Sequence, residues 1–142
     1  MVTDMAKVVI LGAGHVGSMC ALNLARLGIC REIVLIDIVE GKADAQAKDV
    51  ADATVFMDRM PIVREGSYQD CNDADIIVNA VGVSRKPGQT RLDLLDVTID
   101  IMKDAVARLN RTTFDGYFIS ISNPCDVVVN YAREHLKLPK NR

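Results

Sequence analysis

The chain has 142 residues, of which 49% are hydrophobic and 25% charged, and its formal net charge is -2. This length allows one domain with a single substantial core, and the near-balanced charge excludes the broad basic surface typical of nucleic-acid-binding proteins. The apolar runs are too short to cross a bilayer and the N-terminus has no apolar signal core, so we expect a cytoplasmic protein without membrane contact.

The first predicted elements are a strand and a helix. Residues 8–11 form a short β-branched run before a glycine turn, which is typical of a buried strand. The following apolar residues recur at three- and four-residue steps, which predicts one face of a helix that Gly28 ends. That face consists of Val16, Met19, Cys20, Asn23, Leu24 and Leu27.

The rest of the chain continues the alternation of short strands and helices. The predicted strands are 33–36, 61–64, 75–81 and 117–121, and the predicted helices are 42–57, 95–109 and 126–136. Short buried strands that alternate with helices predict an α/β fold with a parallel sheet covered on both faces. Right-handed crossovers favour the doubly wound strand order 3-2-1-4-5. Without an internal repeat or linker, residues 1–142 are expected to form one domain.

Four cysteines are spread along the chain, at Cys20, Cys30, Cys71 and Cys125. No pair has the Cys-x-x-Cys spacing of a metal or redox motif. In a cytoplasmic protein such cysteines are reduced thiols in or near the core, so we expect neither disulfides nor a metal site.

A glycine-rich turn links the first strand to the first helix. Gly12 is expected to make the tight turn, Gly14 to let a pyrophosphate approach the backbone, and Gly17 to allow close packing of helix on strand. The free N–H groups of the helix start would face the phosphates. We expect His15 to be a helix N-terminal residue without a catalytic role. Glycine-rich turns also occur in methyltransferases and by chance. The predicted cofactor-binding turn consists of Gly12, Ala13, Gly14, His15, Val16 and Gly17.

Asp37 ends the second predicted strand, twenty residues after Gly17. An acid at this place accepts hydrogen bonds from the hydroxyls of the adenosine ribose. Its charge also repels the 2′-phosphate of NADP, so the sequence predicts a preference for NAD. The alternative is a solvated acid at a strand end.

Polar residues also follow the fourth and fifth strands, where open α/β sheets bind ligands. Arg85 and Arg91 flank a Pro-Gly turn, and arginine can grip a carboxylate or steady a developing alkoxide. The alternative is a surface loop with incidental charge. Asn123 follows the fifth strand and can cap the last helix, with Pro124 at the first helical position and Asp126 closing the cap. Its amide can also contact cofactor and substrate.

Taken together, these motifs resemble the lactate/malate dehydrogenase family, whose first domain is a Rossmann fold. The resemblance rests on GAGHVG, LIDI, NAVG, RKPGQTRLDLL and SNP in the family's order. It implies that Arg91 lies on a loop that closes over the substrate, that Asn123 bonds the substrate oxygen, and that Ile121 lines the cofactor site. It also implies that Arg85 occupies the specificity position, where arginine pairs with the distal carboxylate of oxaloacetate. Ala80, Gly82 and Thr98 complete the implied cofactor site, although many malate enzymes have asparagine in place of Thr98.

The resemblance implies hydride transfer between NAD and an L-2-hydroxy acid, with malate and oxaloacetate favoured. Because TRLDLL is closer to bacterial lactate enzymes, lactate or a branched 2-hydroxy acid is the alternative substrate. The family's catalytic histidine lies in a C-terminal domain, and neither His15 nor His135 stands in its motif. We therefore expect a sixth strand and a catalytic domain outside this chain, no turnover by residues 1–142 alone, and a homodimer or homotetramer for the full protein. The rival hypotheses are an NAD-dependent glycosidase and a non-catalytic NAD-sensing module.

Overall fold

The computed structural model describes residues 5–83, 87–90 and 92–142. Within these residues the strands are β1 (Ala6–Leu11), β2 (Cys30–Ile36), β3 (Ile62–Glu65), β4 (Ile76–Asn79) and β5 (Tyr117–Ser120). The α-helices are α1 (His15–Leu27), α2 (Lys42–Ala53), α3 (Leu95–Leu109) and α4 (Cys125–His135), and two 3-10 helices are η1 (Tyr68–Cys71) and η2 (Leu92–Leu94).

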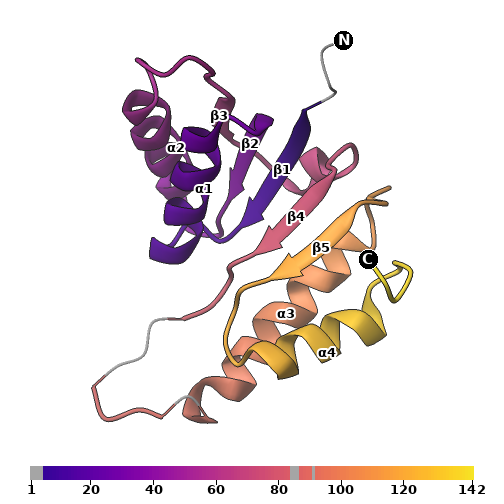
Figure 1. Cartoon of the computed structure of the whole chain (residues 1–142). Helices are drawn as coiled ribbons and strands as arrows, with labels where there is room; N and C mark the ends of the chain where they lie inside the picture. Colours follow the sequence, from indigo (N-terminus) through magenta and orange to yellow (C-terminus); the bar gives the residue numbers. More distant parts are fainter. Residues whose placement is uncertain (1–4, 84–86, 91) are drawn as a thin grey trace.

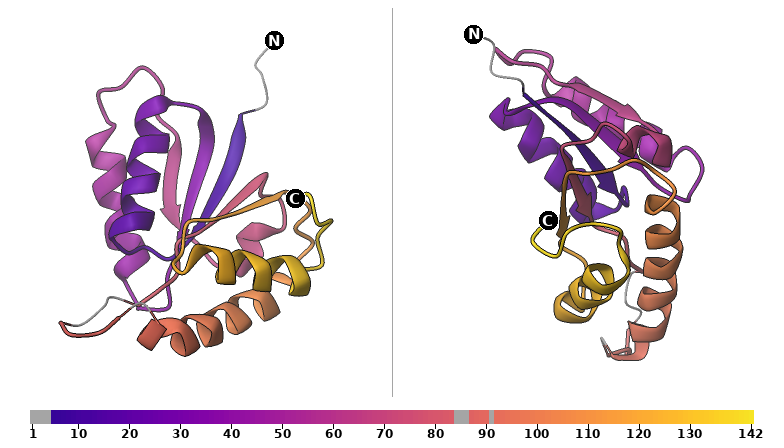
Figure 2. Two further views of the ribbon diagram at one scale, coloured as in Figure 1. Left: turned by 60° about the horizontal axis from the view of Figure 1, so that its bottom comes forward. Right: turned by 90° about the vertical axis from the view of Figure 1, so that its right-hand side faces the viewer.

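The strands form one parallel sheet in the order β3-β2-β1-β4-β5, which confirms the predicted fold class and strand order. Figures 1 and 2 show α1 and α2 on one face of the sheet and α3 and α4 on the other. The central strand is buried on both faces, since Val9 and Ile10 are both inaccessible and belong to opposite sides of the core. This two-sided burial explains the continuous apolar run that predicted the strand.

The apolar face predicted for α1 only partly matches the face that packs against the sheet, because Cys20 and Leu24 pack against the core whereas the other large apolar residues of that face are exposed. Its buried residues are the small Gly17, Ala21 and Ala25, whereas Val16 and Leu27 are 57% and 67% exposed. Small side chains let the helix axis approach the strands closely, so this helix is buried through its alanines and glycine. Periodicity predicted the helix correctly and its buried face only in part.

Most predicted boundaries agree with the structure to within a few residues. The largest difference is α2, which ends at Ala53 rather than at residue 57. There the Thr54 hydroxyl donates to the carbonyls of Val50 and Ala51, at 3.2 and 3.0 Å. Such a local side-chain bond competes with helix continuation. The 3-10 helices were not predicted.

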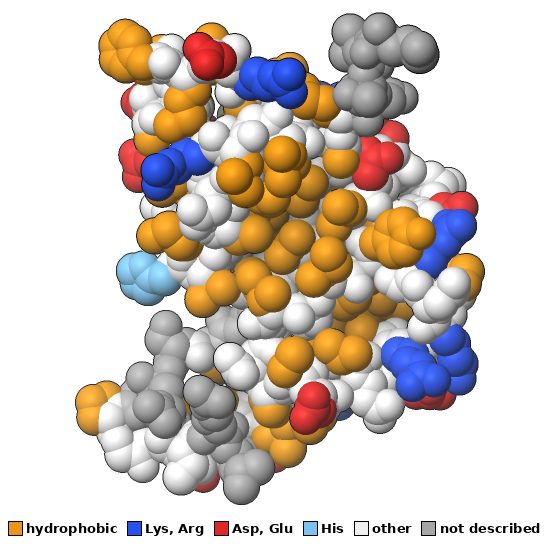
Figure 3. All heavy atoms as spheres, viewed as in Figure 1, with side chains coloured by type: hydrophobic (Ala, Val, Ile, Leu, Met, Phe, Trp, Pro, Cys, Tyr) orange, Lys and Arg blue, Asp and Glu red, His pale blue; other side chains and the backbone are white. Residues whose placement is uncertain are grey.

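One half of the sheet has an uncovered apolar surface. On β5, Phe118 packs toward α3 and α4, so the alternating Tyr117 and Ile119 point to the α1 face, where both are exposed. Figure 3 shows hydrophobic side chains gathered in the middle of this face. In the described residues, no helix covers this part of the sheet (Figure 1). No described helix has the length and apolar character needed to cross a membrane.

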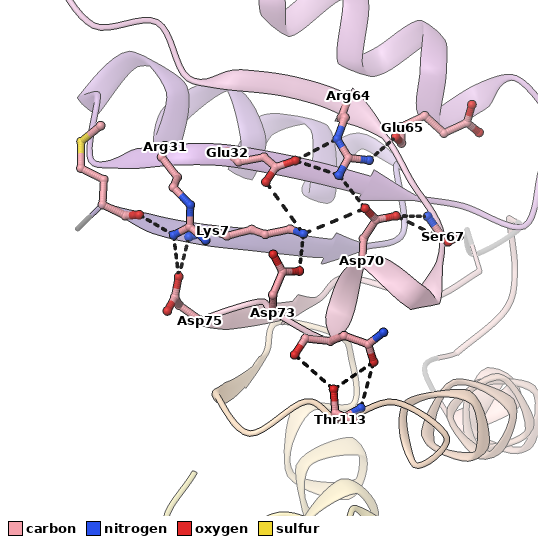
Figure 4. Close-up of polar contacts among 12 residues, drawn as sticks. Lys7, Arg31, Glu32, Arg64, Glu65, Ser67, Asp70, Asp73, Asp75 and Thr113 are labelled. Atoms are coloured by element: carbon pink, nitrogen blue, oxygen red, sulfur yellow. Dashed lines mark hydrogen bonds and ion pairs between the residues drawn. The ribbon is translucent and has the colours of Figure 1, made fainter.

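A network of ion pairs around the buried Lys7 joins β1, β2 and β3 to η1 (Figure 4). Lys7 is 3% exposed, and its Nζ lies 2.6 Å from Asp73 Oδ1, 3.8 Å from Glu32 Oε2 and 4.0 Å from Asp70 Oδ1. Arg64 bonds both Glu32 and Asp70. Burial raises the pKa of Asp70, but the hydrogen bonds from Arg64 and Ser67 outweigh burial and the pKa lies below its ordinary value. The network therefore stabilises the sheet as long as these carboxyls are ionised.

Candidate functional site

The predicted site residues gather where the parallel strands end. The glycine turn follows β1, Asp37 follows β2, Ala80 follows β4 and Ile121 follows β5. Because β2, β1, β4 and β5 are adjacent and parallel, these segments lie along one edge of the sheet (Figure 1). This edge is the place where open α/β sheets bind ligands.

The glycine turn has the geometry that its sequence predicts. Gly12 has φ +95°, and a Cβ there would lie 2.8 Å from Ala80 O, so the turn passes directly beside the end of β4. A Cβ on Gly17 would lie 1.9 Å from Gly12 O, which makes glycine obligatory at that position. A Cβ on Gly14 would meet no atom within 4 Å. Two glycines thus allow close packing, and the third borders open space.

The N-terminus of α1 is open toward that space. The first helical hydrogen bond runs from Ser18 N to Gly14 O at 2.9 Å, so the earlier N–H groups of the helix have no acceptor within it. Within the described residues, Gly14 provides no side-chain cap and the first turn contains no acid. The helix dipole and the free N–H groups therefore suit an anionic group such as a pyrophosphate.

Asp37 is bonded to the glycine turn itself. Its Oδ2 accepts from Ala13 N at 2.8 Å, its Oδ1 accepts from Val39 N at 2.9 Å, and Lys42 Nζ lies 3.2 Å from Oδ2. Burial raises the pKa of Asp37, but these two N–H groups and Lys42 outweigh burial, and the pKa lies below its ordinary value. The carboxylate is thus a fixed negative charge that also holds the turn in place.

The ends of β4 and β5 form the other half of the edge. Ala80 N donates to Leu11 O at 2.8 Å, and Ile121 N donates to Asn79 O at 2.9 Å, so both segments are anchored to the sheet. Asn123 is exposed immediately beyond them. In the described part of the chain no hydrogen bond engages its amide, which leaves the amide available to a ligand.

Comparison with known proteins identifies the family. Residues 6–142 match the model of the lactate/malate dehydrogenase NAD binding domain. The chain belongs to the lactate/malate dehydrogenase family. Its cofactor is accordingly NAD, and the open space at Gly14 with the free N-terminus of α1 fits the pyrophosphate of that cofactor.

Individual members of the lactate/malate dehydrogenase family are similar over nearly the whole chain. An L-lactate dehydrogenase of Lactococcus lactis subsp. cremoris is 40% identical over 136 residues, which are 96% of this chain and 43% of the relative. The minor L-lactate dehydrogenase of Enterococcus mundtii, in its ligand-bound form, has a TM-score of 0.89 at 36% identity. The malate dehydrogenase of Cryptosporidium parvum has a TM-score of 0.89 at 29% identity. These two structures each cover 96% of this chain, which covers 44% of each of them. The chain therefore spans less than half the length of these relatives.

The structure corrects one prediction at the end of β5. Asn123 is not the N-cap of α4: the helix begins at Cys125, its N-cap is Pro124, and no side chain caps it. The Asn123–Pro124 peptide bond is cis. The capping hypothesis is therefore wrong, while the contact of Asn123 with cofactor and substrate stays a prediction.

Other predicted family positions differ in accessibility. Arg85 and Arg91 lie outside the described residues. Thr98 is 2% exposed and lies among the buried residues of α3. His15 and Gly82 are exposed. These assignments stay predictions.

Sequence reasoning missed two features of the nucleotide side. Lys42, at the start of α2, pairs with Asp37 and steadies its charge. Ile38 is 86% exposed directly after Asp37, and Val39 is also exposed. An apolar pair that follows a strand-ending acid was visible in the sequence, and a flat apolar base could rest on it.

Proposed function

We propose that this chain is the nucleotide-binding half of an NAD-dependent L-2-hydroxy-acid dehydrogenase. The main support is that two features lie along the same edge of the sheet: the uncapped start of α1 and the free amide of Asn123. Asp37 holds the start of α1 in place through its hydrogen bond from Ala13 N. A non-catalytic NAD-sensing module would account for the start of α1 and for Asp37, but it would give the Asn123 amide no role.

On the nucleotide side, each role follows from the local chemistry. The N–H groups at the start of α1 bind the pyrophosphate, and the Asp37 carboxylate accepts from the ribose hydroxyls. Ile38 and Val39 offer an apolar surface to the adenine. NAD supplies the hydride acceptor for the reaction.

On the substrate side, polar groups of this chain orient the 2-hydroxy acid. Asn123 donates to the oxygen on the reacting carbon, and Ile121 and Ala80 line the nicotinamide end of the edge. As the family resemblance implies, Arg91 polarises the substrate carbonyl. The general base, as the family resemblance implies, is a histidine outside this chain.

The substrate acid depends on Arg85. We propose malate and oxaloacetate, because an arginine at this position can pair with a second carboxylate through two parallel hydrogen bonds. Lactate and pyruvate are the second candidate, which the 40% identity to a lactococcal L-lactate dehydrogenase supports.

We propose further that the apolar surface of Tyr117 and Ile119 is covered by the rest of the protein, including a sixth strand beside β5. Relatives of more than twice this length support this. We place the whole protein in the cytoplasm as a homodimer or homotetramer.

A substrate panel tests the proposal. The whole protein that contains this chain is assayed for NADH oxidation with oxaloacetate, pyruvate and 2-oxoisocaproate. We expect turnover, with the highest kcat/KM on oxaloacetate. A higher kcat/KM on pyruvate would replace malate with lactate. NADH binding without turnover on any 2-oxo acid would contradict the dehydrogenase and favour the sensing module.

A further inference from the structure

A buried amide interrupts the apolar core directly beneath the site. Asn79, the last residue of β4, is 0% exposed, whereas the three residues before it are all apolar. Burial of a primary amide is unfavourable unless its polar atoms are hydrogen-bonded. The position therefore requires an explanation from its contacts.

The Asn79 amide bonds both serines at the end of β5. Its Nδ2 lies 3.1 Å from Ser120 Oγ and 3.2 Å from Ser122 Oγ, with Met102 Sδ at 3.3 Å as a third neighbour. Ser120 ends β5 and Ser122 directly precedes Asn123. The amide thus connects β4 with the segment that carries Asn123.

The hydroxyl of Ser122 determines how this amide is oriented. It donates to Val81 O at 2.7 Å and lies 3.2 Å from Asn79 O. Since its one proton is used on backbone carbonyls, Ser122 can only accept from Asn79, so Nδ2 must face it. The opposite atom, Asn79 Oδ1, is the one buried side-chain polar atom without a partner among the described residues. A buried acceptor without a donor is costly and uncommon, which indicates that the contacts on the Nδ2 side are what the residue provides.

We propose that Asn79 is a positioning residue, which holds the Ser122–Asn123 segment so that the Asn123 amide stands at the reacting oxygen of the substrate. This inference rests on the proposed dehydrogenase function. Beyond the ladder pairing of Asn79 with Ser120, the backbone bond from Ile121 N to Asn79 O continues the connection between β4 and this segment in the described residues. The Asn79 amide and the Ser122 hydroxyl add the side-chain bonds that restrict the segment just before Asn123.

The variants distinguish the effect of the Asn79 hydrogen bonds from the effect of the side-chain volume. Asn79→Leu keeps a side chain of similar size and removes the donors, and Ser122→Ala removes the other end of the same contact. Ile77→Val is the matched control, because Ile77 is equally buried in β4 and its aliphatic side chain forms no hydrogen bond to either serine. Asn79→Thr restores a hydroxyl donor and serves as the conservative variant.

Kinetics of the whole protein on its best 2-oxo acid give the first readout. We expect Asn79→Leu to lower kcat by about tenfold to a hundredfold, as small displacements of a substrate-positioning group do, with a much smaller change in the Kd for NADH, because the proposed pyrophosphate and ribose contacts lie at the α1 end of the site. The double variant with Ser122→Ala should lose less kcat than the product of the two single losses, because the two variants share the contact between the Asn79 amide and Ser122, although Ser122→Ala also removes the bond to Val81 O. Asn79→Thr should regain part of kcat. Full kcat in Asn79→Leu, or losses that multiply in the double variant, would overturn the proposal.

Amide hydrogen exchange of the whole protein gives a second readout that does not need activity. Asn79→Leu should accelerate exchange in the peptide that covers residues 119–125 and leave residues 6–11 unchanged, and Ile77→Val should not produce this pattern. Unchanged exchange in 119–125 overturns the positioning role. If the unaltered protein turns over no 2-oxo acid, the proposed function fails, whereas the exchange measurement still tests the contact.

Discussion

Removal of the Asp37 charge should weaken the discrimination between NADH and NADPH. The carboxylate is ionised at neutral pH, since burial is outweighed by two backbone N–H groups and Lys42 and its pKa lies below the ordinary value. Two like charges about 4 Å apart repel by about 1 kcal/mol in water and about 4 kcal/mol at an effective dielectric constant of 20. Lys42, 3.2 Å from Oδ2, offsets part of this repulsion. We therefore expect NADPH to bind about tenfold to a hundredfold more weakly than NADH.

Two substitutions separate charge from shape at this position. Asp37→Asn keeps an oxygen that can accept from Ala13 N and removes the charge, so the ratio of the two Kd values should fall toward one. Asp37→Ser should narrow the ratio as well, and should also lower the free energy of unfolding by about 1.5 to 3 kcal/mol for each lost charge-assisted bond. Asp44→Ser is the control, because Asp44 is an acid in the first turn of α2 that pairs with the exposed Lys48.

Fluorescence titration of the whole protein with NADH and NADPH measures both Kd values. Equal affinity of the unaltered protein for the two nucleotides would refute the charge argument. An equal narrowing of the ratio by Asp44→Ser and Asp37→Asn would also refute it, because a general reduction of negative charge would then suffice.

Three further predictions concern the glycine turn, the ion pairs around Lys7 and the substrate. Gly17→Ala should lower the free energy of unfolding by at least about 3 kcal/mol, because its Cβ would lie 1.9 Å from a backbone oxygen. Gly14→Ala should leave urea unfolding unchanged and weaken NADH binding. A Gly17→Ala variant as stable as the unaltered protein would contradict the packing argument. The depressed pKa values of Asp70 and Asp73 mean that their stabilisation is complete above the ordinary carboxyl pKa and is lost as the pH falls through the lowered values. The urea concentration at the midpoint of unfolding should therefore decrease as the pH is lowered below about 5, and this decrease should be smaller in Asp73→Asn. An equal decrease of the midpoint in the unaltered protein and in Asp73→Asn would show that Asp73 does not contribute to it. Arg85→Gln should lower the ratio of kcat/KM for oxaloacetate to that for pyruvate by about 30- to 1000-fold, whereas equal losses on both acids would leave malate without its main support.

The local sequence was sufficient for the fold and for the nucleotide turn. Strand and helix periods alternate strictly, and right-handed crossovers leave few ways to connect them, so the order β3-β2-β1-β4-β5 followed from the pattern. The requirement for glycine at Gly12 and Gly17 also followed, because Gly12 has φ +95° in a tight turn and a Cβ on Gly17 would meet Gly12 O within the same turn. Such features depend on residues close in sequence, or on rules of handedness that hold for all chains.

Features that depend on distant residues were decided only in the tertiary structure. The sequence suggested no role for Asn79, because its serine partners lie more than forty positions away. The buried face of α1 was predicted only in part because the close approach of the sheet selects small residues, which periodicity of large apolar residues does not register. Asn123 looked like a helix cap, but α4 starts two residues later. Contacts between residues distant in sequence, such as those of Asn79 with Ser120 and Ser122 or of α1 with the sheet, cannot be inferred from local preferences.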